Sequence, residues 1–195
     1  MRVAIGLTVA ALLAVTAVTA GVAGATTKAQ LKAKTLPLSA MPIGWSVDYS
    51  SGSSSSAPAC LRDLKAPAKH VVRAEVTYTD GKLPSLDEVL ETGGGATARY
   101  AKFNKALSRC KSITFDTGGK TLKGTIGAMS FPKVGNRSGA YAITVPDNGL
   151  NIGLDIVLVV VGAYVVALDY SDLGQPDPQQ LRRFVNKAVA LVEGK

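Results

Sequence analysis

The chain has 195 residues, 47% of them hydrophobic and 18% charged, and this length suits one domain with a substantial core. Its formal net charge is +8, which suits a surface that meets anionic polymers or lipid headgroups. One histidine and two cysteines leave little material for a metal centre, and we expect neither a metal nor a cofactor.

Residues 1–25 predict an export signal. Arg2 precedes a long run of Ala, Val and Leu, and the small residues Ala23 and Ala25 favour signal-peptidase cleavage after Ala25. An uncleaved N-terminal anchor is the alternative, because the apolar run approaches the roughly 20 residues that span a bilayer. We therefore expect an extracytoplasmic protein of the cell envelope, secreted after cleavage, with no nucleic acid among its partners.

Two cysteines, Cys60 and Cys110, follow this signal. In an exported chain such a pair predicts one disulfide, which would stabilise the fold by about 4 kcal/mol. The alternative is a nucleophilic or metal-binding cysteine.

The predicted domain occupies residues 38–195, after a flexible basic lead-in over 26–37. Residues 45–50 alternate apolar and polar side chains, which predicts a strand with one buried face, and a Ser-rich loop follows over 50–59. Residues 70–79 alternate in the same way. The side chains expected to face inward there are Val72, Ala74, Val76 and Tyr78.

Two helices are predicted next. Ser85 and Glu88 have the spacing of a capping box, so we expect a helix from residue 85 to the glycines at 93–95. The second helix covers 96–110, with Cys110 on its buried face beside Tyr100, Phe103 and Leu107. Another side of this helix collects four basic residues, Arg99, Lys102, Lys105 and Arg109. That side is either a solvated face or a contact for anionic lipid or phosphate-bearing glycan.

Residues 121–131 and 139–145 predict two more strands, and the apolar stretch 155–170 follows them. As a helix, 156–168 would span about 20 Å against a hydrocarbon core of about 30 Å, with Asp155 and Asp169 at its ends. We therefore predict a hairpin around Gly162, in which Val161 faces Tyr164 and Val159 faces Val166. Both of its faces are apolar. The hairpin is thus either central and covered on both sides, or covered on one side with the other face lining a cleft.

The last predicted element is a helix capped by Asp177, with Pro178 in its first turn. Its apolar side consists of Leu181, Phe184, Val185, Ala188 and Val192. Short connections between successive strands favour antiparallel pairing. The class is therefore α+β, an antiparallel sheet with helices packed on it and a ligand cleft as one outcome.

The sequence contains little that indicates a catalytic site. His70 is the only histidine, and no G-x-S-x-G motif accompanies the many serines. We expect no enzymatic activity. A secreted hydrolase that uses a serine with His70 is an alternative.

Five segments together carry a family resemblance. They are a Met-Pro-x-Gly-Trp segment at 41–45, AEVTY at 74–78, ALSRC at 106–110, VLVVVGAYVVALDY at 157–170 and QQLRRFVNKAVALV at 179–192. Over residues 36–193 the chain resembles the PknH-like extracellular domain of actinobacteria. That family supplies the sensor of a receptor serine/threonine kinase and many secreted or lipid-anchored envelope proteins.

The resemblance implies an α+β domain with a cleft for an unidentified ligand and no enzymatic activity. Members commonly have two disulfides, whereas this chain can form one, and the lipid-attachment cysteine of the lipoproteins is missing. We expect a sensor-like ligand-binding domain whose ligand is a small molecule or an envelope lipid or glycan. A signal would pass through a membrane signalling protein. A structural envelope protein that binds anionic polymers, or an anionic membrane surface, through the basic helix side is the further alternative.

Overall fold

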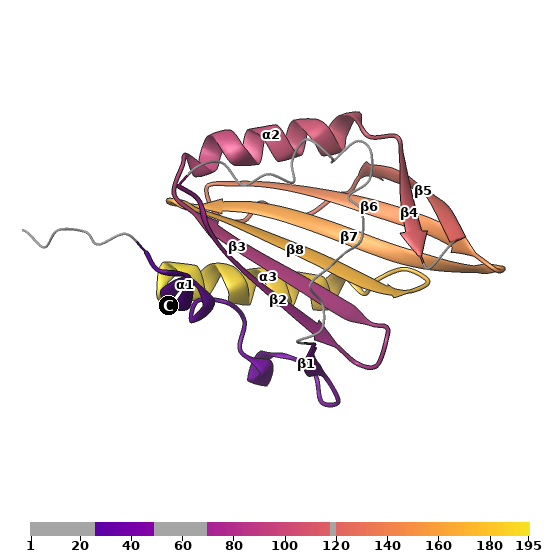
Figure 1. Ribbon diagram of the computed structural model, residues 1–195, viewed down its shortest axis with the longest axis horizontal. Helices are drawn as coiled ribbons and strands as arrows, with labels where there is room; N and C mark the ends of the chain where they lie inside the picture. Colours follow the sequence, from indigo (N-terminus) through magenta and orange to yellow (C-terminus); the bar gives the residue numbers. More distant parts are fainter. Residues whose placement is uncertain (1–25, 49–69, 118–119) are drawn as a thin grey trace, which may run out of the picture.

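A computed structural model describes residues 26–48, 70–117 and 120–195. Within these ranges one eight-stranded sheet carries helix α2 on one face and helices α1 and α3 on the other (Figure 1). The strand order is β1-β2-β3-β8-β7-β6-β5-β4, and every neighbouring pair is antiparallel. The predicted α+β class is confirmed.

The strands are β1 (Ser46–Asp48), β2 (Val72–Thr79), β3 (Ser85–Thr92), β4 (Ser112–Thr117), β5 (Lys120–Ala128), β6 (Arg137–Asp147), β7 (Leu150–Val161) and β8 (Tyr164–Leu173). The helices are α1 (Lys28–Lys32), α2 (Ala96–Arg109) and α3 (Pro178–Glu193), with a 3₁₀ turn, η1 (Leu38–Ala40), after α1.

The path of the chain explains why α2 lies across the sheet. After β3 the chain leaves the sheet, crosses it as α2 and enters the opposite edge as β4. It then returns strand by strand, each strand antiparallel to the one before it, until β8 pairs with β3. The return path from β4 to β8 is therefore an antiparallel meander.

The hairpin of β7 and β8 is the centre of the sheet, and its predicted register is confirmed. Val161 pairs with Tyr164 and Val159 with Val166, around a turn in which Gly162 has φ of 56°. Gly at the first turn position with positive φ is what a type II′ turn requires.

Each face of this hairpin packs into a different core. Val157, Val159 and Leu168 belong to the core under α3, which also holds Leu181 and Phe184. Leu158, Val160 and Val165 belong to the core under α2, which also holds Tyr100 and Leu107. Because strand side chains alternate between faces, a strand covered on both sides is apolar throughout. The hairpin is therefore covered on both sides, as one of the two interpretations had it.

The prediction of a helix over residues 85–92 was wrong, because this segment is strand β3. Leu86, Glu88 and Leu90 face the α3 side and are buried, and the strand pairs with β2 and β8 along its whole length. Glu88 does not cap a helix; it is 0% exposed. Pairing on both edges satisfies the backbone polar groups of the segment, which outweighs the weak local preference for a helix.

The N-terminal lead-in also differs from its prediction. Residues 28–32 form α1, in which Thr27 and Gln30 make the capping box, and Leu31 is fully buried. Lys34 donates from Nζ to the Val192 carbonyl near the end of α3, at 3.3 Å. The lead-in is therefore part of the folded unit. Strand β4 was not predicted at all.

Candidate binding site

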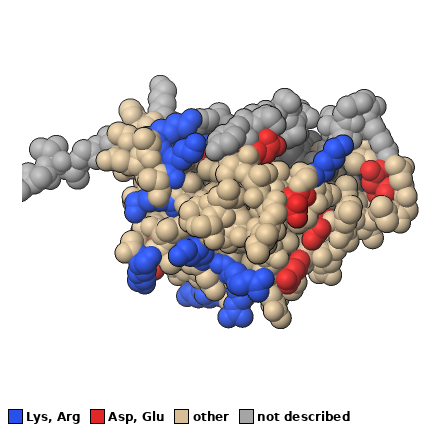
Figure 2. Space-filling view, turned by 90° about the horizontal axis from the view of Figure 1, so that it is seen from below, with Lys and Arg blue, Asp and Glu red and all other residues tan. Residues whose placement is uncertain are grey.

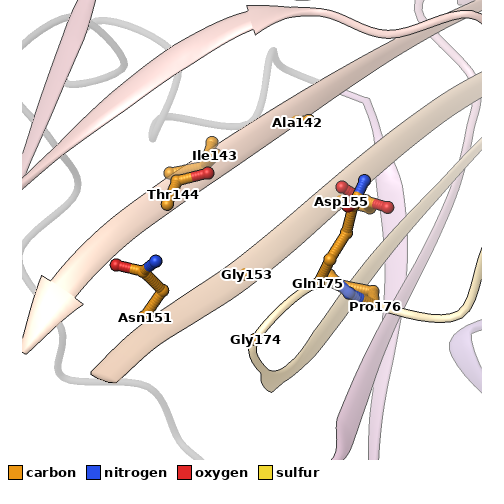
Figure 3. Close-up of a pocket in the computed structure, with 9 residues that line it drawn as sticks. All are labelled: Ala142, Ile143, Thr144, Asn151, Gly153, Asp155, Gly174, Gln175 and Pro176. Carbon is orange, nitrogen blue, oxygen red and sulfur yellow. The ribbon is translucent and has the colours of Figure 1, made fainter. Parts of the chain in front are cut away.

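A polar pocket of about 290 Å³ lies on the α3 side of the sheet, beyond the start of that helix (Figure 3). Its floor is made by β6 and β7, and its wall by the loop 174–176 that joins β8 to α3. The lining consists of Ala142, Ile143, Thr144, Asn151, Gly153, Asp155, Gly174, Gln175 and Pro176.

Small residues shape this pocket. Gly153 lets the loop that forms the wall pack directly on β7, since a Cβ there would lie 2.3 Å from the Gly174 carbonyl oxygen and 2.4 Å from Pro176 Cδ. Ala142 is opposite Asp155 in the register, and Gly127 is next to Ala142 on β5. A Cβ added at Gly127 would meet nothing within 4 Å, so this face of the sheet is uncovered at Gly127, two strands away from Asp155.

Asp155 is the charged group of the pocket. Its relative exposure is 2%, and burial raises the pKa of its carboxyl to about 6. Tyr170, a core residue that stacks against Trp45 and Phe184, is its neighbour on β8. A carboxylate in such surroundings gains from a hydrogen-bond donor on its open side. Because Asp155 lines the pocket, a bound ligand can supply this donor.

The other polar groups are a hydroxyl and two amides. Thr144 and Asn151 lie on the strands, and Gln175 lies on the loop that folds back beside β7 (Figure 3). Together with Asp155 they offer acceptors and donors at several points of one small space. Among the described residues that line the pocket there is no His and no Cys. This arrangement can bind a ligand by hydrogen bonds.

The four basic residues of α2 differ in exposure. Lys102, Lys105 and Arg109 are exposed, but the side chain of Arg99 is only 10% exposed. Its Nε lies 3.1 Å from Oε2 of Glu91, whose other oxygen lies 3.5 Å from Arg73. Arg99 therefore neutralises a buried carboxylate of β3 and belongs to the fold.

His70 is exposed and precedes β2 with a φ of 70°. Its carbonyl oxygen lies close to Gly93, at one end of the sheet. At the same end the Thr92 hydroxyl donates a hydrogen bond to the Ala163 carbonyl. The pocket lies near the opposite end of β7. Over residues 26–48, 70–117 and 120–195, no group of three or more His, Cys, Asp or Glu is placed to hold a metal ion.

Cys110 is buried at the end of α2, with 5% exposure. Cys60 and Ala25 lie outside the residues that the structure describes, so the disulfide and the cleavage site remain predictions. On the α2 side of the hairpin a small pocket of about 110 Å³ remains beside Phe103, Leu158 and Val165.

Sequence reasoning did not predict the pocket. Asp155 was considered only as a charge at the end of an apolar run. The available signal was a charged residue inside a strand whose neighbours on both faces are apolar, since such a charge needs a partner or a polar space. The loop that closes the pocket could not be placed from local patterns.

Among solved structures, the chain is similar to the extracellular domain of PknH from Mycobacterium tuberculosis. The identity is 14% and the TM-score 0.64, over 87% of this chain and 98% of that one. Cyanobacterial PsbP from Synechocystis also matches, at 12% identity over 78% of this chain and 81% of that one, but its TM-score of 0.31 gives it no weight. No protein-family model and no curated protein matches the chain.

The first likeness shows the fold. It agrees with the sheet and helices expected from the resemblance in the sequence. Among the described residues, no helix is long and apolar enough to cross a membrane.

Proposed function

We propose that this chain is an extracytoplasmic, non-catalytic binding domain that takes a small hydroxyl-rich ligand, such as a sugar unit, in the pocket beside loop 174–176. A sensor-like role follows if occupation of the pocket is read by a membrane partner. The fold likeness to an extracellular domain supports the compartment and the absence of catalysis. The apolar N-terminal segment at residues 1–25 also supports this compartment.

The observation that carries the proposal is Asp155, a carboxylate with 2% exposure in the floor of a pocket that is also lined by Thr144, Asn151 and Gln175. Hydroxyl groups of a ligand would donate to the carboxylate and to the amide oxygens, and would accept from the amide nitrogens. Such charge-assisted hydrogen bonds are strong enough to orient a small polar molecule. The volume of about 290 Å³ suits a ligand of that size.

The ligand class is tested by ¹⁵N–¹H correlation spectra of the protein titrated with neutral mono- and disaccharides and inositol. We expect one or more of these to shift the amide signals of Asn151, Gly153 and Gln175. Asp155→Asn should weaken the binding by roughly 10- to 100-fold, the value of a hydrogen bond to a charged group. Glu193→Gln removes the same charge at the exposed end of α3 and should leave the affinity unchanged.

Binding should also weaken as the pH falls through about 6, because protonation of Asp155 removes the charge that the ligand stabilises. The proposal is wrong if no compound of the panel moves the pocket signals, or if Asp155→Asn binds as tightly as the natural protein.

A further inference from the structure

The turn over residues 42–45 presents an exposed apolar tip. Trp45 donates its backbone N–H to the Pro42 carbonyl at 3.3 Å, and Gly44 has φ of 99°, as a type II turn requires at its third position. Ile43 is at the tip and is 103% exposed. The turn is held firmly, because Met41 and Trp45 on either side of Ile43 are both buried in the core under α3.

A groove of about 390 Å³ adjoins this turn. One side is formed by Ala40, Met41 and Pro42, and the other by α3 residues at helical spacing, Gln180, Arg183, Phe184 and Lys187. Leu38, at the start of η1, is 46% exposed beside it in the chain. The groove therefore combines apolar walls with two exposed cations one helical turn apart.

The lining of this groove carries two cations, Arg183 and Lys187. In Figure 2, which views the molecule from below, blue side chains gather mainly on one half of the face and red side chains mainly on the other half. None of the described residues that line the groove is acidic. One carboxylate borders the turn: Oδ2 of Asp80 would lie 3.3 Å from a Cβ added at Gly44.

We propose that this turn and groove form a contact site for an anionic phospholipid membrane. Ile43 and Leu38 enter the boundary between headgroups and acyl chains, while Arg183 and Lys187 bind headgroup phosphates. An exposed apolar tip flanked by basic residues is the pattern of proteins that lie on a membrane without crossing it. This site is separate from the pocket at Asp155, so either proposal can fail without the other.

Trp45 makes the proposal directly testable, because it is the only tryptophan of the chain and lies two residues after Ile43. The protein is purified in its natural processed form, with its N-terminus established by intact mass. It is then mixed with vesicles of phosphatidylcholine and phosphatidylglycerol, or of phosphatidylcholine alone. We expect binding to the anionic vesicles only, weakening with added salt, and quenching of Trp45 by brominated acyl chains.

Four variants locate the site. Ile43→Ser should reduce the affinity about tenfold, since one large apolar side chain no longer leaves water. Arg183→Gln and Lys187→Gln should each reduce it about fivefold, the effect of one cation near an anionic surface. Asp80→Asn should increase it. Each substituted residue lies at the surface or beside the turn, and circular dichroism checks that each variant is folded.

Two controls use the rest of the surface. Lys105→Gln removes a charge from α2, and Leu150→Ser removes an apolar side chain that is 64% exposed at the start of β7. Neither should change vesicle binding. Loss of binding in Lys105→Gln with none in Arg183→Gln would place the contact on α2 and overturn the proposal, as would vesicle binding without quenching of Trp45.

Discussion

Leu36 donates its backbone N–H to Oε2 of Glu88 at 2.7 Å, and this hydrogen bond fastens the N-terminal segment to the middle of the sheet. Tyr78 on the neighbouring strand donates its hydroxyl to the Leu36 carbonyl. Glu88 is 0% exposed, and its second carboxylate oxygen has no hydrogen-bond partner among the residues that the structure describes. Burial raises the pKa of Glu88 to about 7, although the Leu36 N–H opposes the shift.

The stability of the protein should therefore depend on pH through Glu88. The pKa is about 7 in the folded state and 4.5 ordinarily, so the contribution of Glu88 is fully present below pH 4.5 and is lost as the pH rises through 7. The Gln side chain of Glu88→Gln stays neutral at every pH, so this variant should lose about 3 kcal/mol less unfolding free energy than the natural protein as the pH rises. Urea unfolding of the natural protein and of the variant at about pH 5 and about pH 9 measures this difference. Glu75→Gln, at a half-exposed position, is the control, and parallel pH profiles for Glu88→Gln and the natural protein would contradict the prediction.

Asp87 and Asp169 are opposite each other on β3 and β8, and Thr77 donates its hydroxyl to Asp87. Burial, followed by the charges of Asp87 and Asp155, raises the pKa of Asp169 to about 8. The contribution of Asp169 to stability is thus lost as the pH rises through 8. At about pH 9 Asp169→Asn should be more stable by on the order of 2 kcal/mol, once solvent screening is allowed for. Thermal unfolding at that pH tests this, with Asp172→Asn as the matched control on the same strand.

Arg99 should behave as a structural residue and Lys105 as a surface residue. Arg99→Ala leaves the buried Glu91 with only the longer contact to Arg73, and should cost about 2–3 kcal/mol of unfolding free energy. Lys105→Gln should change it by less than about 0.5 kcal/mol. Chemical denaturation of the two variants compares these values. Equal effects would mean that the ion pair with Glu91 contributes nothing.

Gly153 should tolerate no side chain, whereas Gly127 should. Gly153→Ala would push the new Cβ against the Gly174 carbonyl and Pro176, displacing the wall of the pocket. We expect a loss of about 1–3 kcal/mol and of ligand binding. Gly127→Ala meets open space and should be neutral within about 0.5 kcal/mol. Denaturation and the same ligand titration measure both, and a neutral Gly153→Ala would mean that the loop moves freely.

The predicted disulfide has its own test. If Cys60 and Cys110 are joined, the denatured protein will show no free thiol until a reductant is added. Replacing both cysteines by serine should lower the stability by about 4 kcal/mol on the chain-entropy account. Two titratable thiols in the unreduced protein would show that Cys60 and Cys110 are not joined.

The helix predicted over residues 85–92 shows where local patterns stop being informative. Residues i and i+4 share a face in a helix and also in a strand, so Leu86 and Leu90 fit both. The inward residue between them is Glu88, and its charge hid the alternation of the strand. Only the pairing with β2 and with β8, which lies far along the sequence, decides between the two.

By itself, the sequence determined the elements whose signals are local. The turn at Gly162 and the apolar run on each side define the β7–β8 hairpin and its register, and Asp177 and Pro178 define the start of α3. Tertiary structure alone decided which charged side chains are buried and which partners they have. Glu88, Arg99 and Asp155 are ordinary polar residues in the sequence. Their roles depend on Leu36, Glu91 and the loop at Gly174, because burial and partnership of a charge are set by segments that meet only when the chain folds.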